Sequence, residues 1–291
     1  MGVFPRVFPG MPPLLLLRMA MMIYVLIDTV FGFLLGAACA SFFNVLVSGS
    51  GDIKKNLARK RSMCESCDQQ LRWWELIPVL SWLCLKGRCA RCGKPIPWIH
   101  PISELVVGLA FVSVITMGGE PVIIGARFVI VLILYFFSMY DVFHRLVPNS
   151  YLGWLIFVLI SVRVIFAFEA ESISYVVPYV VGSAAGFAFF WVINVLTQLG
   201  LFPGVHGGQD GFGWGDAKYS ILVGLILGWP ASFLSVWIAV FGGAIIGVAA
   251  LVRERRKGMT LPFIPFLSGG AFIMMVWGGN IVDIVRRFLM Y

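Results

Sequence analysis

The sequence predicts an all-α polytopic membrane protein with about eight transmembrane helices and one small polar insertion. Of its 291 residues, 60% are hydrophobic and 12% are charged, whereas a soluble domain carries about 25% charged residues. The mean hydropathy of +0.93 is too high for one water-soluble core. Lipid admits helices or closed barrels, and the sequence lacks the alternating pattern of a barrel.

Apolar stretches recur along the whole chain. Crossing roughly 30 Å of hydrocarbon takes about 20 apolar residues in a helix. The stretches that predict helices lie near 22–48, 101–118, 123–140, 150–168, 175–197, 217–228, 231–252 and 261–278. The sixth is short, and it runs through Gly228-Trp229-Pro230 into the seventh. The expected organisation is an N-terminal extension (1–21), a first helix (22–48), a polar insertion (49–100), a transmembrane core (101–280) and a tail (281–291).

The basic residues predict the orientation. Lysines and arginines crowd residues 49–100 and 253–257, and short loops rich in these residues stay in the cytoplasm. The acidic loop 168–173 is then external, and so is the N-terminus. Arg286 and Arg287 fall outside in this topology, against the trend of the other loops. The net charge of +8 is thus explained by orientation, and no nucleic-acid partner is expected.

Four cysteines in the polar insertion have the spacing of a metal site. Cys64 and Cys67 form one pair, Cys89 and Cys92 form a second, and 21 residues separate the two pairs. Two such pairs close a tetrahedral zinc site of the structural type, which can fold a segment too small for its own core. Two disulfides or a redox pair are the alternatives. A reducing cytoplasm disfavours the first, and the second needs a βαβ context.

Two aspartates stand where predicted helices meet the cytoplasm. Asp141 ends the third apolar stretch, and Asp216 precedes the sixth within a glycine-rich run. Ionisable groups at membrane depth are functional candidates. Two carboxylates that share a site cannot both ionise cheaply, so one keeps a proton while the other acts as a base. Such a pair can hydrolyse a peptide bond. Taken singly, Asp216 could merely cap its helix, and Asp141 could pair with Arg145 or His144.

Several motifs occur together and in a fixed order over about residues 36–270. Gly213–Asp216 is a GxGD motif followed by Lys218, and Asp141 stands six residues before Val147-Pro148-Asn149. The others are Ser41–Val45, the cysteine pairs, Leu76–Trp82, His100–Glu104 and Pro262–Leu267. This set resembles the bacterial type IV prepilin peptidase/N-methyltransferases.

The resemblance implies two activities. Such enzymes cut type IV prepilins or type II secretion pseudopilins at the cytoplasmic face of the bacterial inner membrane, in contact with membrane lipid. They then methylate the new N-terminus with S-adenosylmethionine. Asp141 and Asp216 match the family's catalytic pair. Gly87, Arg88 and Glu104 match residues connected with methyl transfer, and the zinc-bearing loop marks the bifunctional members.

Three alternatives remain open at this point. The protein could be a peptidase without methyltransferase activity, in which case the zinc loop would be structural. It could be a transporter that uses its acids for protons or cations, although that predicts charges near the midplane and an inverted repeat. Asp210, six residues before Asp216, is a further acid in the glycine-rich run and a distant alternative to Asp216.

Overall fold

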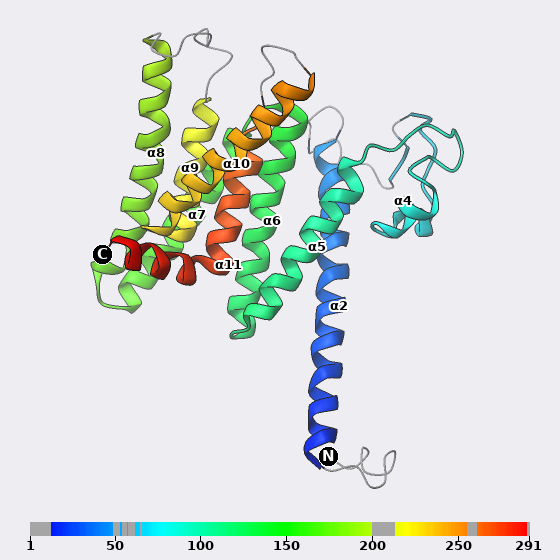
Figure 1. Ribbon diagram of the computed structural model, residues 1–291, viewed down its shortest axis with the longest axis horizontal. Coiled ribbons are helices and arrows are strands. Elements are labelled where there is room, and N and C mark those ends of the chain that lie inside the picture. Colours follow the sequence, from blue (N-terminus) through cyan, green and yellow to red (C-terminus); the bar gives the residue numbers. More distant parts are fainter. Residues whose placement is uncertain are drawn as a thin grey trace. The chain divides into compact units, whose positions relative to one another are not determined.

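The structure is a computed structural model that describes residues 13–48, 53, 57, 62–64, 66–199, 213–254 and 261–289 (Figure 1). Asp210 lies outside these residues. Within them the secondary structure is helical, apart from two isolated β-bridges that join Met63 to Gln70 and Arg88 to Pro95. The predicted all-α fold is confirmed.

Seven helices of the described residues contain a stretch long and apolar enough to cross a membrane. They are α2 (Pro13–Val47), α5 (Ile99–Met117), α6 (Pro121–His144), α7 (Asn149–Glu169), α8 (Val177–Gln198), α10 (Ala231–Glu254) and α11 (Ile264–Leu289). Short elements are η1 (Trp73–Leu76), α4 (Leu80–Cys84) and η2 (Ile173–Tyr175).

The sixth expected helix is present but short. It forms α9 (Trp214–Leu227), which has 14 residues and ends at the C-cap Gly228. At 1.5 Å per residue this is about 21 Å, less than the roughly 30 Å of a hydrocarbon core. We therefore count seven spans and one shorter helix where the sequence predicts about eight.

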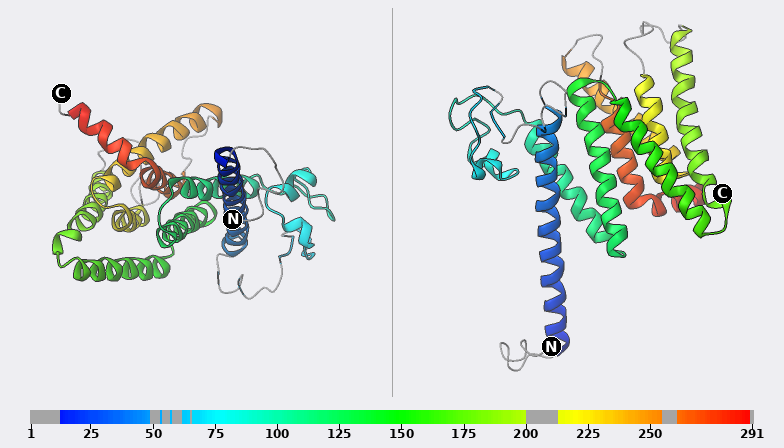
Figure 2. Two further views of the ribbon diagram at one scale, coloured as in Figure 1. Left: turned by 90° about the horizontal axis from the view of Figure 1, so that it is seen from below. Right: turned by 180° about the vertical axis from the view of Figure 1, so that it is seen from behind.

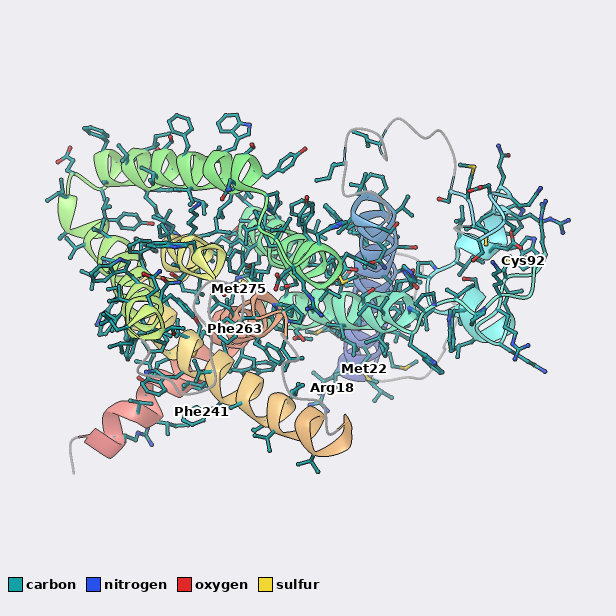
Figure 3. The ribbon with its side chains drawn as sticks, turned by 90° about the horizontal axis from the view of Figure 1, so that it is seen from above. Arg18, Met22, Cys92, Phe241, Phe263 and Met275 are labelled. Atoms are coloured by element: carbon teal, nitrogen blue, oxygen red, sulfur yellow. The ribbon has the colours of Figure 1, made fainter. Side chains whose placement is uncertain are left out.

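The first helix is longer than the sequence analysis predicts. It begins at Pro13 rather than near Met22 and has 35 residues. Proline fits the first turn of a helix because its missing N–H would be unpaired there, and the leucines that follow are good helix formers. Arg18 and Met22 are both part of this continuous helix (Figure 3).

The chain forms two compact units. Unit 1 comprises residues 1–46 and 54–132, and unit 2 comprises residues 47–53 and 133–291. Unit 1 holds α2, the cysteine segment (residues 62–98), α5 and the first half of α6. In its core Phe111 of α5 stacks on Phe128 of α6, with the ring centroids 4.3 Å apart.

In unit 2 the short helix α9 lies at the centre. It contacts α7, α8, α10 and α11 (Figure 2), and most of its residues are buried. Helix α8 approaches α9 closely because small residues meet at the contact, namely Ser183 on α8 and Gly224 on α9. Small residues at such a contact let two membrane helices pack backbone to backbone.

Candidate active site

The two predicted acids come from helix ends in unit 2. Asp141 lies three residues before the end of α6 at His144, and Asp216 is the third residue of α9. The C-terminal end of α6 and the N-terminal end of α9 lie at the same end of this unit (Figure 1). The two carboxylates are close enough for the charge of Asp141 to affect the ionisation of Asp216.

Asp141 is held by the start of another helix. Its side chain is 7% exposed, and its Oδ2 accepts a hydrogen bond of 3.2 Å from the backbone N–H of Ile264. Ile264 is the first residue of α11. The first N–H groups of a helix lack partners within the helix and carry its positive dipole end. The start of α11 therefore stabilises a negative charge on Asp141.

Asp216 occupies the first turn of α9, which is not among the seven spans. Its Oδ2 accepts a hydrogen bond of 3.0 Å from the N–H of Gly213, the N-cap of the helix. Burial raises the pKa of Asp216 from 3.8 to about 7, the negative charge of Asp141 adds to the rise, and the Gly213 N–H opposes it. Asp216 therefore caps its helix, and a substantial share of its carboxyl groups keeps the proton near neutral pH.

The motif residues around the two acids contact one another. A Cβ on Gly215 would lie 2.6 Å from Cγ2 of Val147, so glycine lets the start of α9 pack against the loop after α6. Lys218 Nζ donates a hydrogen bond of 3.2 Å to Oδ1 of Asn149. The Val-Pro-Asn and GxGD motifs, distant in the sequence, are therefore joined beside the acids.

His144 has a structural partner at this end of unit 2. Its Nε2 lies 2.8 Å from the carbonyl oxygen of Val47. This hydrogen bond ties the end of α6 to the end of α2. To form the ion pair with Asp141 that the sequence left open, His144 would have to give up this hydrogen bond to Val47.

Sequence reasoning missed Arg163, which lies within the apolar helix α7. Its guanidinium donates hydrogen bonds of 3.0 and 3.2 Å to the carbonyl oxygen of Leu225 and one of 3.1 Å to that of Ile226. It also lies 3.6 Å from the centre of the Tyr179 ring. Leu225 and Ile226 belong to the last turn of α9, whose carbonyls lack partners within the helix.

Arg163 therefore caps the C-terminal end of the short helix that carries Asp216. The positive charge also complements the negative end of the helix dipole. The signal was present in the sequence, because a basic residue interrupts the fourth apolar stretch.

The four cysteines of unit 1 come together. The Sγ atoms of Cys64, Cys67, Cys89 and Cys92 all lie within 4.8 Å of one another, and those of Cys64 and Cys92 are 4.0 Å apart. Figure 3 labels Cys92 in this segment. The backbone N–H of Cys92, and after it that of Arg91, lower the pKa of Cys89 to about 7, whereas desolvation and the thiols of Cys64 and Cys92 raise the pKa of Cys67 to about 11.

The two cysteine pairs share one backbone fold. The N–H of Cys64 donates to the carbonyl of Gln69, and its own carbonyl accepts from Asp68, both at 2.9 Å. In the second pair the N–H of Cys89 donates to Lys94 at 2.9 Å, and its carbonyl accepts from Gly93 at 3.0 Å. Two equal knuckles facing each other explain how a small segment presents four sulfurs to one point.

Gly87, one of the residues predicted for methyl transfer, lies under a tryptophan ring. Its φ is +68°, and a Cβ would lie 2.6 Å from Cζ2 of Trp82. The Trp82 ring donates from Nε1 to the carbonyl of Ile96 at 3.2 Å. Arg88 follows at the β-bridge to Pro95. Glycine at position 87 is therefore needed to form this turn.

Glu104 joins the cysteine segment to the helices of unit 1. It is 8% exposed, and its Oε2 accepts a hydrogen bond of 2.7 Å from the N–H of Val79. The Ser41 side chain of α2 also hydrogen-bonds Glu104. Nearby, Asn44 donates to Ser103 at 2.9 Å. The motifs at 41–45 and 100–104 thus form one buried polar contact.

Comparison with known proteins agrees with these motifs. Residues 34–117 match the bacterial peptidase A24 N-terminal domain, and residues 128–248 match the type IV leader peptidase family. The first range contains the four cysteines and Glu104, and the second contains Asp141 and Asp216. No solved structure matches the chain.

Similar curated proteins carry one name, prepilin leader peptidase/N-methyltransferase. That of Stutzerimonas stutzeri is 30% identical over 80% of this chain and 77% of its own length. That of Burkholderia pseudomallei strain 1026b is 32% identical over 84% and 73%, and that of Bacillus subtilis strain 168 is 30% identical over 77% and 84%.

The resemblance seen in the motifs is therefore confirmed over most of the chain. Together with the seven apolar helices, it identifies a multi-pass membrane protein. The chain belongs to the type IV leader peptidase family, and its similar relatives are prepilin leader peptidase/N-methyltransferases.

Proposed function

We propose that this protein is a membrane aspartic endopeptidase that cleaves the leader from type IV prepilins or pseudopilins and then N-methylates the new N-terminus. The observation that carries the peptidase is the convergence of Asp141 and Asp216, each held by a backbone N–H at the start of a helix. The names of the relatives support both activities.

The two carboxylates take complementary roles in the hydrolysis. Asp141, stabilised as an anion by the start of α11, takes a proton from water as the oxygen attacks the scissile carbonyl carbon. Asp216, protonated near neutral pH, gives its proton to the carbonyl oxygen. In the second step Asp141 passes its proton to the leaving nitrogen, Asp216 recovers one from a hydroxyl, and the C–N bond breaks. The pair is restored with its original single proton.

The position of the pair suits a substrate that crosses the membrane surface. We place this end of unit 2 in the cytoplasm because the basic clusters at 49–100 and 253–257 follow the positive-inside trend. A prepilin has a basic leader in the cytoplasm and an apolar helix in the membrane. The peptidase core then comprises residues 101–280, and its acids lie at the depth of the junction that is cut.

The cysteine segment, within the predicted insertion at 49–100, is proposed to hold one structural zinc ion and to serve methylation. A tetrahedral zinc with bonds of about 2.3 Å places its sulfurs roughly 3.8 Å apart. The four Sγ atoms, all within 4.8 Å, fit this geometry with a small contraction. Cys64, Cys67, Cys89 and Cys92 would be the ligands, and zinc there would fix the fold of the segment.

S-adenosylmethionine would supply the methyl group. Gly87, Arg88 and Glu104 are the residues proposed for this activity, and the contacts of Gly87 and Glu104 favour an indirect role for both. Gly87 supports Trp82, and Glu104 anchors Val79 to α5. Each would act by holding the shape of the segment rather than by contacting the donor.

Prepilin cleavage in liposomes by Asp141→Asn and Asp216→Asn variants tests the peptidase. Each substitution keeps the size of the side chain and removes its acid–base function, so we expect cleavage to fall by at least about a thousandfold. Glu169→Gln, an exposed acid at the far end of α7, is the control and should leave cleavage unchanged. Full activity in either aspartate variant would refute the pair.

Methyl transfer from labelled S-adenosylmethionine to a mature pilin separates the two family functions. We expect the aspartate variants to methylate a mature pilin at the wild-type rate. If the wild-type protein cleaves prepilin but transfers no label, the protein is a peptidase with a structural zinc loop.

A further inference from the structure

Large apolar side chains are exposed on one part of the cysteine segment. Trp73 is 79% exposed and Trp98 is 67% exposed. Together with Leu76, Leu80 and Leu83, which are also exposed, they form what we call the apolar face. The face extends over η1, α4 and the residue before α5. Helix α4 contacts η1, and the Trp98 ring meets that of Trp82 in α4, so these exposed apolar groups lie on neighbouring elements. On an otherwise polar segment they indicate a binding surface.

Two connections fix this face at the level where α5 begins. Trp98 directly precedes the apolar helix α5, and its ring lies 4.1 Å from that of Trp82 in α4. Val79, the N-cap of α4, is bonded to Glu104. Glu104 is the sixth residue of α5, about 8 Å along the helix from its start at 1.5 Å per residue.

Helix α5 matches the thickness of the hydrocarbon core. Its 19 residues extend about 28 Å, close to the roughly 30 Å of a bilayer core. The anchor at Glu104 therefore holds the start of α4 at or just below the headgroup boundary. Figure 1 shows α4 to one side of α2 and α5, somewhat below the end of α2 and the start of α5.

Exposed basic side chains occur in the same segment as the apolar face. Arg72, Lys86, Arg88, Arg91 and Lys94 are all exposed in the same segment. The cytoplasmic leaflet of a membrane carries anionic lipids that attract such residues, and tryptophan favours the boundary between headgroups and acyl chains. The basic charge and the apolar surface of the segment therefore both fit an anionic membrane surface.

We propose that the apolar face inserts into the anionic cytoplasmic leaflet of the membrane that the chain itself spans. Trp73, Trp98, Leu80 and Leu83 enter the headgroup boundary, and the arginines and lysines contact the phosphates. The proposal rests on the orientation given under the proposed function. It makes the cysteine segment a membrane-bound element of unit 1.

Tryptophan quenching in nanodiscs tests this contact without any substrate. The full-length protein is placed in nanodiscs of phosphatidylcholine and phosphatidylglycerol with brominated acyl chains, and Trp73→Phe and Trp98→Phe variants identify the signal of each ring. The fluorescence of each ring is the difference between the wild-type protein and the variant that lacks that ring. We expect brominated lipid to quench this difference signal, and aqueous iodide to leave it largely unquenched. Quenching of these two rings should decrease when phosphatidylglycerol is omitted.

A charge insertion provides the second arm. Leu80→Glu/Leu83→Glu should abolish the lipid quenching of Trp73 and Trp98, because two carboxylates cannot enter an anionic boundary cheaply. Leu80→Met/Leu83→Met keeps apolar side chains of similar volume at the same positions and should preserve the quenching. Zinc content at the wild-type level in both variants shows that the segment is folded.

Three results would overturn the proposal. Iodide quenching of Trp73 and Trp98 with no effect of brominated lipid would show that the face is in water. Protection of both rings only after a pilin peptide is added would assign the face to the substrate, and protection that depends on protein concentration would assign it to a second copy. Because the readout needs no cleavage, a failure here is distinguishable from a failure of the peptidase assignment.

Discussion

The two chemical sites of this protein are built in opposite ways. The acid pair takes its parts from the ends of α6, α9 and α11, which are far apart in the sequence and meet through the packing of unit 2. The cysteine cluster takes its parts from two short knuckles between residues 64 and 92, each formed by its own backbone hydrogen bonds. The first depends on helix packing, and the second depends on local turns and on the ion proposed to bind there.

Among the variants that distinguish the two sites, loss of one cysteine should have the largest effect. Cys89→Ser removes a thiolate from a site whose zinc contributes about 10–16 kcal/mol in small zinc domains. We expect the metal to be lost and methyl transfer to collapse, while prepilin cleavage stays within a few-fold of wild type. Metal analysis and the two activity assays on one preparation measure this. Cys84→Ser, an exposed cysteine outside the cluster, is the control, and a wild-type zinc content in Cys89→Ser would contradict the metal site.

Removal of the cap on α9 should destabilise unit 2 and impair cleavage. Arg163→Met leaves the carbonyls of Leu225 and Ile226 without their donors, and each unpaired buried group costs about 1–3 kcal/mol. We expect a lower Tm and a lower kcat for cleavage, with partial recovery in Arg163→Lys.

The matched control for this cap lies in unit 1. Arg127 donates to the carbonyl of Gly118, the C-cap of α5, at 2.8 Å. Arg127→Met should therefore lower the Tm without a comparable loss of kcat. Equal losses of kcat in the two variants would show that the effect of Arg163 is general instability rather than the position of Asp216.

A methyl group at the start of α9 should disturb the acid pair by overpacking. In Gly215→Ala the new Cβ would meet Cγ2 of Val147, and such overpacking costs about 1–3 kcal/mol. We expect kcat for cleavage to fall with little change in zinc content. Combining it with Val147→Ala removes the clashing methyl groups and should restore part of the activity. A double variant no better than Gly215→Ala would exclude this contact as the cause.

The smallest expected effect is a change in how stability depends on pH. Because the folded-state pKa of Asp216 is raised to about 7, its contribution to stability is complete below its ordinary pKa of 3.8 and is lost as pH rises through 7. Asp216→Asn should therefore show a smaller fall in Tm between pH 5 and pH 8 than wild type. In the wild-type protein cleavage should decline above about pH 7, as Asp216 loses its proton. Parallel Tm curves for the two proteins would contradict the shift.

The sequence predicts the cysteine cluster more completely than the acid site. The spacing of the cysteines predicts the cluster, because local hydrogen bonds close each pair into a knuckle that presents two thiols. For the acids, the motifs identify Asp141 and Asp216 but not the donors that hold them. The contact of Asp141 with the Ile264 N–H joins residues 123 positions apart, and no periodicity or composition encodes such a contact.

The same difference explains the helices. Seven spans follow from hydropathy, since length and composition decide whether a helix can cross lipid. The short length of α9 depends on Gly228 and on the Arg163 cap, which requires α7 and α9 to be neighbours. Glu104 shows the same limit, because the motif identifies the residue and only the fold reveals its bond to Val79.

The bond between Ile264 and Asp141 has a genetic consequence. The donor is a main-chain amide, so an exchange of the Ile264 side chain for valine or leucine leaves it in place, at the expense of packing. Proline alone among the amino acids would delete it, although proline already stands directly after it, at position 265, and two positions before it, at position 262. The codon for residue 264 thus tolerates apolar variety but excludes proline, the residue that follows it directly.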